Sequence, residues 1–350
     1  STLLFNKSPI PVAIKLYDLL FIPFCMYWLI RLTAPSSEYL KIFIGIAFIT
    51  VLAQCAIGLL SWFAPDVLPF RWRTSLEGAR TVGTLRNPAV YTSTLLFLSL
   101  LLFHYAMQCK STALRLGLLL TFGLVMYCVF MSFSRGSWVG GSIFLVGLMF
   151  LYPKPVIRLT IVVFLVVYFL SSSVLADQVA WAYERATGEA ARGTAESRLI
   201  TNNASISMIA AKPLFGWGFG NYDRYDRRFQ TRVGDVPVRD DLTSHNTYLS
   251  IMAEMGLIGF LFYIFPLVWW FLLSIKFWRR LPRDGFWSRR LLVMLWLLLL
   301  HMAIVNTVMD MVRFHLFGTT IWWIALALIG NMVHPYLETG GVGAASLSKQ

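Results

Sequence analysis

A histidine and an asparagine, His245 and Asn246, stand directly before a long apolar run in the segment SHNTYLSIMAEMGLIGF, residues 244–260. An imidazole ordinarily titrates near neutral pH, so it can accept and return a proton under physiological conditions. At the outer end of a membrane helix, such a side chain is suited to act as a general base on a hydroxyl group. The alternative is a histidine that only caps a helix or lies at the membrane interface. We expect the helix to begin near residue 246, with Ser244 as its N-cap.

A second group able to do chemistry is a set of arginines in segments that we expect to share one face of the membrane. From residue 64 onward, these segments hold fourteen arginines and a single lysine, Lys212. The arginines are Arg71, Arg73, Arg80, Arg86, Arg135, Arg185, Arg192, Arg198, Arg224, Arg227, Arg228, Arg232, Arg239 and Arg313. A guanidinium grips two phosphate oxygens at once, so the preference for arginine indicates a phosphate ligand. The alternative is a surface that rests on anionic lipid headgroups.

Two of these arginines stand in the most informative settings. Arg135 lies in FMSFSRGSWVGG, a tight turn between two apolar runs, and therefore close to membrane depth. Ionisable groups there are costly unless they have a partner, and they are typical of functional sites. The alternative for Arg135 is snorkelling to the headgroups. Arg198 lies in AESRLITNNASISMIAAKPLFGWGFGNY, where apolar spacing predicts a helix that Pro213 ends. The glycines that follow predict a turn. Their spacing gives little support to a phosphate loop, which would require a preceding strand and a following GK[ST].

The acidic and cysteine residues give little support to a metal centre. The four cysteines lie within or at the end of apolar runs and lack metal-ligand spacing. Asp240 and Asp241 are adjacent, but neighbouring side chains in an extended segment point apart and would need a further ligand. We expect one of them to orient His245 or to pair with Arg239. The sequence therefore predicts no metal, no other cofactor and no nucleic-acid partner.

Membrane helices must position these residues. Of the 350 residues, 57% are hydrophobic and 13% are charged, which is too apolar for a soluble domain. The apolar runs are nearly uninterrupted and do not alternate, which favours helical spans over a β-barrel. We predict nine spans, at 10–31, 39–63, 88–107, 113–134, 136–152, 156–175, 247–277, 288–308 and 313–334.

The basic residues of the short loops, above all those of KFWRRLPRDGFWSRR, predict which loops are cytoplasmic. The opposite, outer face then holds the loop 64–87, the turn around Arg135 and the long segment 176–246. The chain accordingly divides into four parts. These are residues 1–175 with six spans and the loop 64–87, the large outer segment 176–246, three further spans in 247–334, and a cytoplasmic tail, 335–350.

Four motifs resemble a known family when they are taken in their order along the chain. They are S-R-G at 134–136, E-S-R-L at 196–199, P-L-F-G-W-G-F-G-N-Y at 213–222, and His245-Asn246, nine residues, Gly256, two residues and Gly259. This pattern is similar to that of the O-antigen ligase and polymerase superfamily, and the likeness runs from about residue 80 to 320. The single large outer segment resembles a ligase more than a polymerase or a protein O-oligosaccharyltransferase.

The resemblance implies an all-α polytopic membrane glycosyltransferase with a GT-C-like helical bundle and one long periplasmic loop with short helices. It implies about twelve spans in the intact protein, so that about three would precede Ser1. The implied reaction transfers an O-antigen glycan from undecaprenyl pyrophosphate to a sugar hydroxyl of lipid A–core. It would take place at the periplasmic face of the bacterial inner membrane, without metal or nucleotide. O-antigen polymerase, protein O-oligosaccharyltransferase and, more distantly, a lipid-linked sugar flippase or transporter stay open as alternatives.

The same resemblance implies roles for particular residues. His245 would be the general base, and Arg135 and Arg198 would stabilise the diphosphate. Further contacts to the diphosphate or the acceptor are expected from Arg80, Arg86, Asn221, Tyr222 and Asn246. Gly256 and Gly259 would allow tight helix packing behind the site. A flippase would instead require basic residues at several depths of the bundle, whereas here they are concentrated in the segments that we expect at the outer face.

Overall fold

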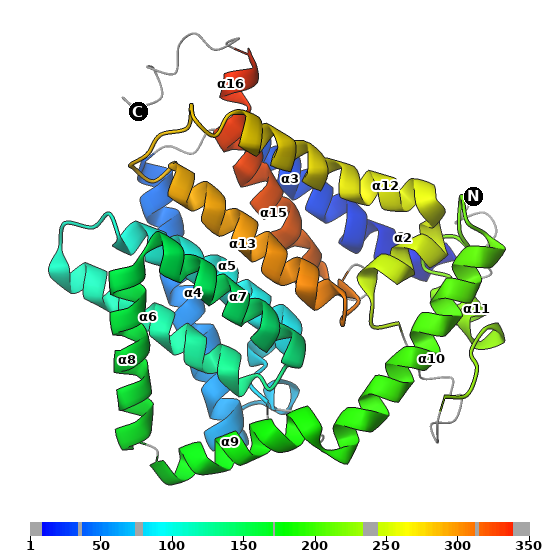
Figure 1. Cartoon of the computed structure of the whole chain (residues 1–350), viewed down its shortest axis with the longest axis horizontal. Coiled ribbons are helices and arrows are strands. Elements are labelled where there is room, and N and C mark those ends of the chain that lie inside the picture. Colours follow the sequence, from blue (N-terminus) through cyan, green and yellow to red (C-terminus); the bar gives the residue numbers. More distant parts are fainter. Residues whose placement is uncertain are drawn as a thin grey trace. The chain divides into compact units, whose positions relative to one another are not determined.

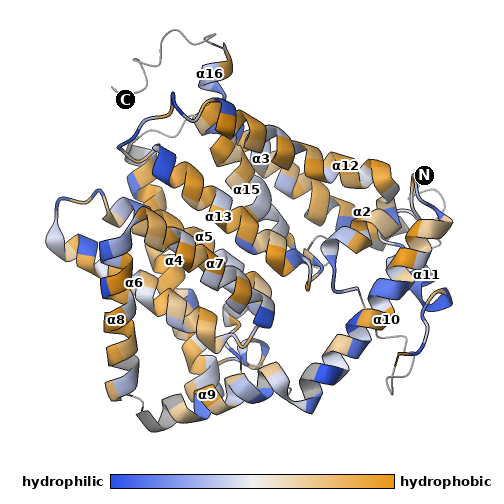
Figure 2. Cartoon of the chain, viewed as in Figure 1, coloured by the Kyte–Doolittle hydropathy of each residue, from blue (hydrophilic) through white to orange (hydrophobic). Residues whose placement is uncertain are grey.

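The computed structural model describes residues 9–33, 37–73, 80–170, 172–233, 244–311 and 315–338 (Figure 1). Within these ranges, seven helices are long and apolar enough to cross a membrane. Figure 2 shows hydrophobic residues along most of the helices and hydrophilic residues gathered on α10 (Glu189–Ala211) and the connecting segments. The chain is an all-α polytopic membrane protein, as its apolar runs predict.

Each of the nine predicted spans overlaps a helical segment in the described part of the chain. In chain order these are α2 (Pro9–Leu16), η1 (Tyr17–Phe21) and α3 (Ile22–Leu32), then α4 (Ser37–Phe63), α5 (Pro88–Ala106), α6 (Thr112–Met131), α7 (Arg135–Leu151), α8 (Pro153–Leu170), α12 (Thr247–Lys276), α13 (Arg289–Asn306) and α15 (Leu316–Val333). The first span thus joins two α-helices through a π-helical turn. The helix α7 is apolar but has only 17 residues.

The other elements are short, except for two helices in the long segment that we expect outside the membrane. The short ones are η2 (Pro65–Val67), η3 (Phe70–Trp72), η4 (Gly83–Leu85), α11 (Tyr222–Tyr225), η5 (Asp226–Arg228) and α16 (Pro335–Glu338). The long segment begins with α9 (Ser172–Thr187) and continues with α10, which has 23 residues. Its helices are therefore longer than expected, although α10 does end just before Pro213, as predicted.

The chain folds as two compact units. The first unit contains residues 1–32, 183–275 and 303–328, and the second contains residues 33–182, 276–302 and 329–350. In the first unit, α12 runs beside α3 (Figure 1), and the indole N–H of Trp270 donates to the hydroxyl of Tyr27 at 3.1 Å. In the second unit, the Tyr91 ring of α5 packs over Gly58 of α4, and its hydroxyl donates to the carbonyl of Gln54 at 3.2 Å.

The helix α12 is interrupted at Gly256, where φ is 68° and ψ is −171°. A break in a membrane helix leaves backbone groups that must find other partners, because lipid offers none. The segment 213–218 supplies them. The N–H groups of Trp217 and Gly218 donate to the carbonyls of Ala253 and Glu254 at 2.9 and 2.7 Å. On the other side of the break, the N–H of Leu257 donates to the carbonyl of Pro213 at 2.8 Å.

This arrangement explains the glycine spacing of the segment 213–222. Gly216, Gly218 and Gly220 all have positive φ, as a backbone that enters a helix break and turns away again requires. A Cβ atom at Gly256 would overlap the backbone carbonyl of Leu214. The lack of a side chain at Gly256 therefore does allow a close contact, as expected. The contact is with the segment 213–222 and not with a second membrane helix. Gly259 lies against the side chain of Met255 in the same helix.

Candidate active site

His245 lies just before the start of α12, and its neighbour Asn246 caps this helix. The side-chain oxygen of Asn246 accepts hydrogen bonds from the N–H groups of Tyr248 and Leu249 at 3.0 and 3.1 Å. Asn246 is therefore the N-cap, and the prediction that Ser244 has this role was wrong. The Ser244 hydroxyl instead accepts from the hydroxyl of Ser250 at 2.7 Å. His245 is half-buried and sits between this serine and the cap.

Two further contacts fix the same helix start against the connection between α13 and α15. The Thr247 hydroxyl donates to the carbonyl of Met309 at 2.9 Å and accepts from the N–H of Met311 at 3.0 Å. The buried carboxylate residue Asp310 lies between these two contact points, with 1% of its surface exposed. Sequence reasoning missed Asp310, although a lone acidic residue in the apolar stretch TVMDMV was a usable signal.

Tyr222, one of the expected substrate contacts, is fully buried in the first unit. Its hydroxyl donates to the carbonyl of Thr201 at 3.0 Å and lies 2.6 Å from the hydroxyl of Ser205, both on α10. Its backbone N–H donates to the carboxylate of Glu254, on α12, at 2.9 Å. In this structure Tyr222 joins α10 to the broken part of α12, and a direct contact with substrate stays a prediction.

Asn221 and Arg198 lie around the same junction. The Asn221 amide donates to the carbonyl of Trp217 at 3.2 Å, and only 9% of the residue is exposed. Arg198 is half-buried on α10, and its carbonyl accepts from the hydroxyl of Thr201 at 3.1 Å. The helical turn that carries Arg198 is therefore the turn on which Tyr222 packs. Within the first unit, the structure thus links Arg198, Asn221 and Tyr222 to the helix that His245 precedes.

The second unit brings two other candidate arginines to one end of its bundle. Arg135 is half-buried and is the first residue of α7. Thr81 lies beside the end of α6, because its N–H donates to the carbonyl of Met131 at 3.1 Å and its hydroxyl to the carbonyl of Cys128 at 2.9 Å. Arg80 precedes Thr81 directly, and Arg135 follows Met131 by one short turn. Arg80 and Arg135 therefore share one end of the second unit.

Arg86, the fourth candidate, is exposed and has a left-handed backbone, with φ of 58°. Its surroundings are held on both sides. Before it, the Thr84 N–H donates to the side-chain oxygen of Gln54 at 3.0 Å. After it, the side chain of Asn87 caps α5 by accepting from the N–H of Ala89 at 2.9 Å. The backbone at Arg86 is thus fixed while its side chain points to solvent.

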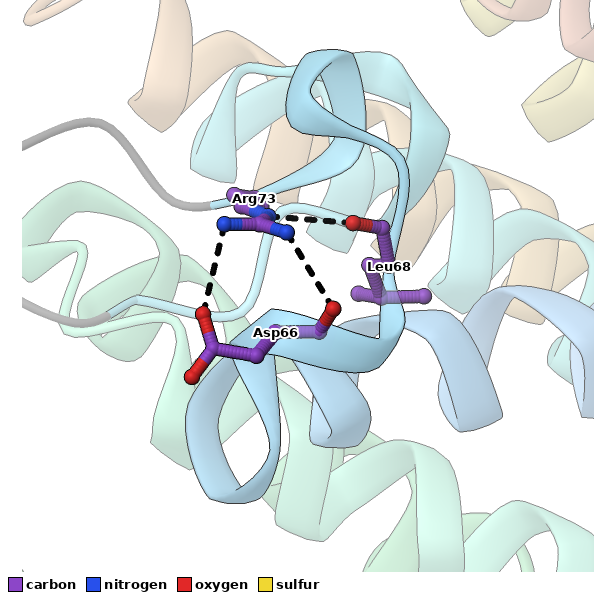
Figure 3. A network of polar contacts seen from close by, with 3 residues as sticks. All are labelled: Asp66, Leu68 and Arg73. Carbon is purple, nitrogen blue, oxygen red and sulfur yellow. Dashed lines mark hydrogen bonds and ion pairs between the residues drawn. The ribbon is translucent and has the colours of Figure 1, made fainter.

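Some arginines of the segments that we expect to be outer contact other residues of the chain. Arg73 folds back on its own loop (Figure 3). Its Nε donates to the carbonyl of Leu68 at 3.0 Å, and its two terminal nitrogens contact the side chain and the carbonyl of Asp66 at 3.3 and 3.1 Å. Arg224 and Arg228 lie over the ring of Tyr225, 5.4 and 5.3 Å from its centre. These three arginines have structural contacts within the chain.

Four residues that the sequence analysis named, Arg239, Asp240, Asp241 and Arg313, lie outside the described residues. In the described part of the chain, no group of three His, Cys, Asp or Glu residues could hold a metal ion. His315, just before α15, is the other histidine near the end of a span that we expect to be outer. Burial lowers the pKa of His315 to about 4.

Residues 118–264 match a family model described as O-Antigen ligase. This match supports the assignment of residues 118–264 to the O-antigen ligase and polymerase superfamily. The matched O-antigen ligase region contains all four motifs of the sequence analysis, together with Arg135, Arg198 and His245. Arg80 and Arg86 lie before it. A search of the curated proteins finds no match to this chain.

Proposed function

We propose that this protein transfers an O-antigen glycan from undecaprenyl pyrophosphate to a sugar hydroxyl of lipid A–core, at the periplasmic face of the inner membrane. Members of the O-antigen ligase and polymerase superfamily are enzymes that act in the membrane on lipid-linked glycans. The observation that carries the proposal is the fixed start of α12, which holds a histidine between a capped helix and a buried serine pair.

His245 is assigned the role of general base. It takes the proton of the acceptor hydroxyl as the hydroxyl oxygen attacks the anomeric carbon of the first donor sugar. The bond between that carbon and the phosphate oxygen breaks, and undecaprenyl pyrophosphate leaves with the electron pair. The cap made by Asn246 and the bonds of Thr247 keep this end of the helix in place, so the imidazole needs little reorganisation during the reaction.

Arg135 and Arg198 are assigned to the diphosphate, with Arg80 and Arg86 as further contacts. Negative charge grows on the diphosphate as the glycosidic bond breaks, and positioned cations stabilise that charge. Arg135 combines a guanidinium with the amide end of a helix, and both attract phosphate. A cation at that end of a helix opposes the helix dipole, so an anionic ligand would also relieve this repulsion.

The test is a reconstituted transfer assay with the lipid-linked glycan as donor and lipid A–core as acceptor, without nucleotide. His245→Ala should reduce transfer by about 100- to 10,000-fold, as the loss of a positioned base does. His315→Ala is the matched control. A histidine with a pKa of about 4 is a weak base, so this variant should retain transfer within a few-fold.

Folding of both variants is checked by thermal unfolding in detergent. Wild-type transfer by a folded His245→Ala protein would remove His245 as the base. Transfer of glycan only to a second lipid-linked glycan, and never to lipid A–core, would identify a polymerase.

A further inference from the structure

A pocket of about 420 Å³ lies in the second unit, between the end of α4 and the middle of α9. Its lining consists of Trp62 from α4 and Asp177, Gln178, Ala180 and Trp181 from α9. None of these residues has a role in the proposed reaction. The volume falls in the range of small-molecule sites, and the question is which chemistry it would accept.

The lining combines two indole rings with a carboxylate and an amide. Indole rings offer flat apolar faces that suit the C–H face of a sugar ring, and carboxylate and amide groups hydrogen-bond to hydroxyls. The described residues that line the pocket include no arginine or lysine, and Asp177 would repel an anion. The pocket is therefore suited to a neutral, hydroxyl-rich ligand and unsuited to a phosphate.

The pocket is partly preorganised and open to a ligand. Gln178 is fully buried, and its amide nitrogen lies 3.1 Å from the hydroxyl of Tyr127, which fixes the side chain. Trp62 is half-buried and packs on Phe133, with their ring centres 5.3 Å apart. Trp181, by contrast, has 48% of its surface exposed. Side chains that are already held in place lower the entropy cost of binding, and the exposed indole of Trp181 is accessible for stacking.

The contact between Trp62 and Phe133 also places the pocket relative to the proposed diphosphate site. Phe133 precedes Arg135 by two residues, at the turn where α7 begins. In the lipid-linked donor, the first sugars follow the diphosphate directly. A sugar-binding pocket that adjoins the arginine turn is therefore placed for the donor glycan.

We propose that the pocket formed by Trp62, Asp177, Gln178 and Trp181 binds sugar rings of the lipid-linked donor glycan. The inference rests on the proposed function for the identity of the donor. The indoles would stack on the ring faces, and Asp177 would accept hydrogen bonds from hydroxyls. Arginines that bind the diphosphate and aromatic residues that bind the glycan would then divide donor recognition between them.

The experiment measures binding to the wild-type protein and its variants in nanodiscs, with three probes. These are undecaprenyl pyrophosphate carrying the glycan, undecaprenyl pyrophosphate without sugar, and lipid A–core. Trp181→Ala should weaken binding of the glycan-bearing donor by about tenfold, in the range expected for loss of an aromatic contact. Its affinity for the sugar-free carrier and for lipid A–core should change less than about twofold. Trp181→Phe keeps an aromatic face and should recover most of the donor affinity.

Tyr183→Ala is the matched control, because Tyr183 is an aromatic residue of α9 with 70% of its surface exposed that does not line the pocket. Equal weakening of all three lipids, or equal effects of Trp181→Ala and Tyr183→Ala, would show that the exposed aromatics of α9 anchor it to the membrane surface. Weakening of lipid A–core alone would place the acceptor in the pocket. Either result overturns the proposal. Because binding is measured without turnover, wild-type protein that binds both carriers but transfers nothing would refute the proposed function alone.

Discussion

The backbone N–H of Tyr222 donates a hydrogen bond of 2.9 Å to the carboxylate of Glu254, and both residues are buried. Glu254 lies two residues before the break in α12, and its carbonyl accepts from the N–H of Gly218. The Tyr222 hydroxyl reaches Thr201 on α10. Glu254 thus contacts the loop after α10 through both its side chain and its backbone carbonyl. These contacts connect the turn of α10 that carries Arg198 to α12, the helix that follows His245.

Glu254→Leu should lower the free energy of unfolding by about 1–3 kcal/mol, because it leaves the buried Tyr222 N–H without its acceptor. Glu254→Gln keeps a side-chain oxygen in place and should lose less. Thermal or denaturant unfolding in detergent measures both. Equal stability of the two variants would mean that the hydrogen bond contributes little.

Tyr222→Phe should lower the free energy of unfolding by about 1 kcal/mol, because the Tyr222 hydroxyl no longer bonds to Thr201 and Ser205. The KM values for donor and acceptor should stay close to those of wild type if the residue acts by packing. Steady-state transfer kinetics provide the measurement. A large rise in either KM, without a matching loss of stability, would support a direct contact between Tyr222 and substrate.

Gly256→Ala should destabilise the protein by about 1–3 kcal/mol through backbone strain alone, with a further loss from the overlap with Leu214. Gly117→Ala is the control, since it lies within the membrane helix α6 and a Cβ there meets nothing within 4 Å. Gly117→Ala should be neutral or stabilising by up to about 1 kcal/mol, because alanine favours helix. Melting temperatures in one detergent compare the two, and similar values would argue against the helix break.

Arg135→Lys should reduce transfer by at least about tenfold, because a point charge replaces a guanidinium fork that grips two phosphate oxygens. Arg73→Lys is the control. The guanidinium of Arg73 is held by Asp66 and Leu68, so this change should leave transfer unchanged (Figure 3). The reconstituted assay measures both rates, and full activity of Arg135→Lys would remove the bidentate contact from the proposal.

Transfer should persist in excess EDTA and without nucleotide, because the proposed charge stabilisation comes from guanidinium groups. The same assay after chelation provides the measurement. Loss of activity that added Mg²⁺ or Mn²⁺ restores would contradict this expectation. Asp240 and Asp241 would then be the candidate metal ligands, and a third ligand from elsewhere in the chain would be needed to hold the ion.

The start of α12 shows where local sequence reasoning reaches its limit. Ser244 and Asn246 are both good N-cap residues, so the local pattern does not choose between them. The choice depends on where the helix begins. In the structure, Thr247 bonds to Met309 and Met311, more than sixty positions away, and this contact places the first turn one residue later than expected.

By itself, the sequence determined that the chain is helical, where its apolar runs form helices, and which segments carry the arginines and the histidine. The length and the periodicity of an apolar run are properties of a single segment, so they do not depend on how neighbouring segments pack. Only the tertiary structure decided that the segment 213–218 fills a break in α12, that Tyr222 is buried against α10 and that Arg73 binds its own loop. The first two depend on buried backbone groups finding partners in other segments of the chain, and burial makes such partners obligatory without specifying them. The third depends on how the loop 66–73 folds back on itself, which the charges alone do not determine.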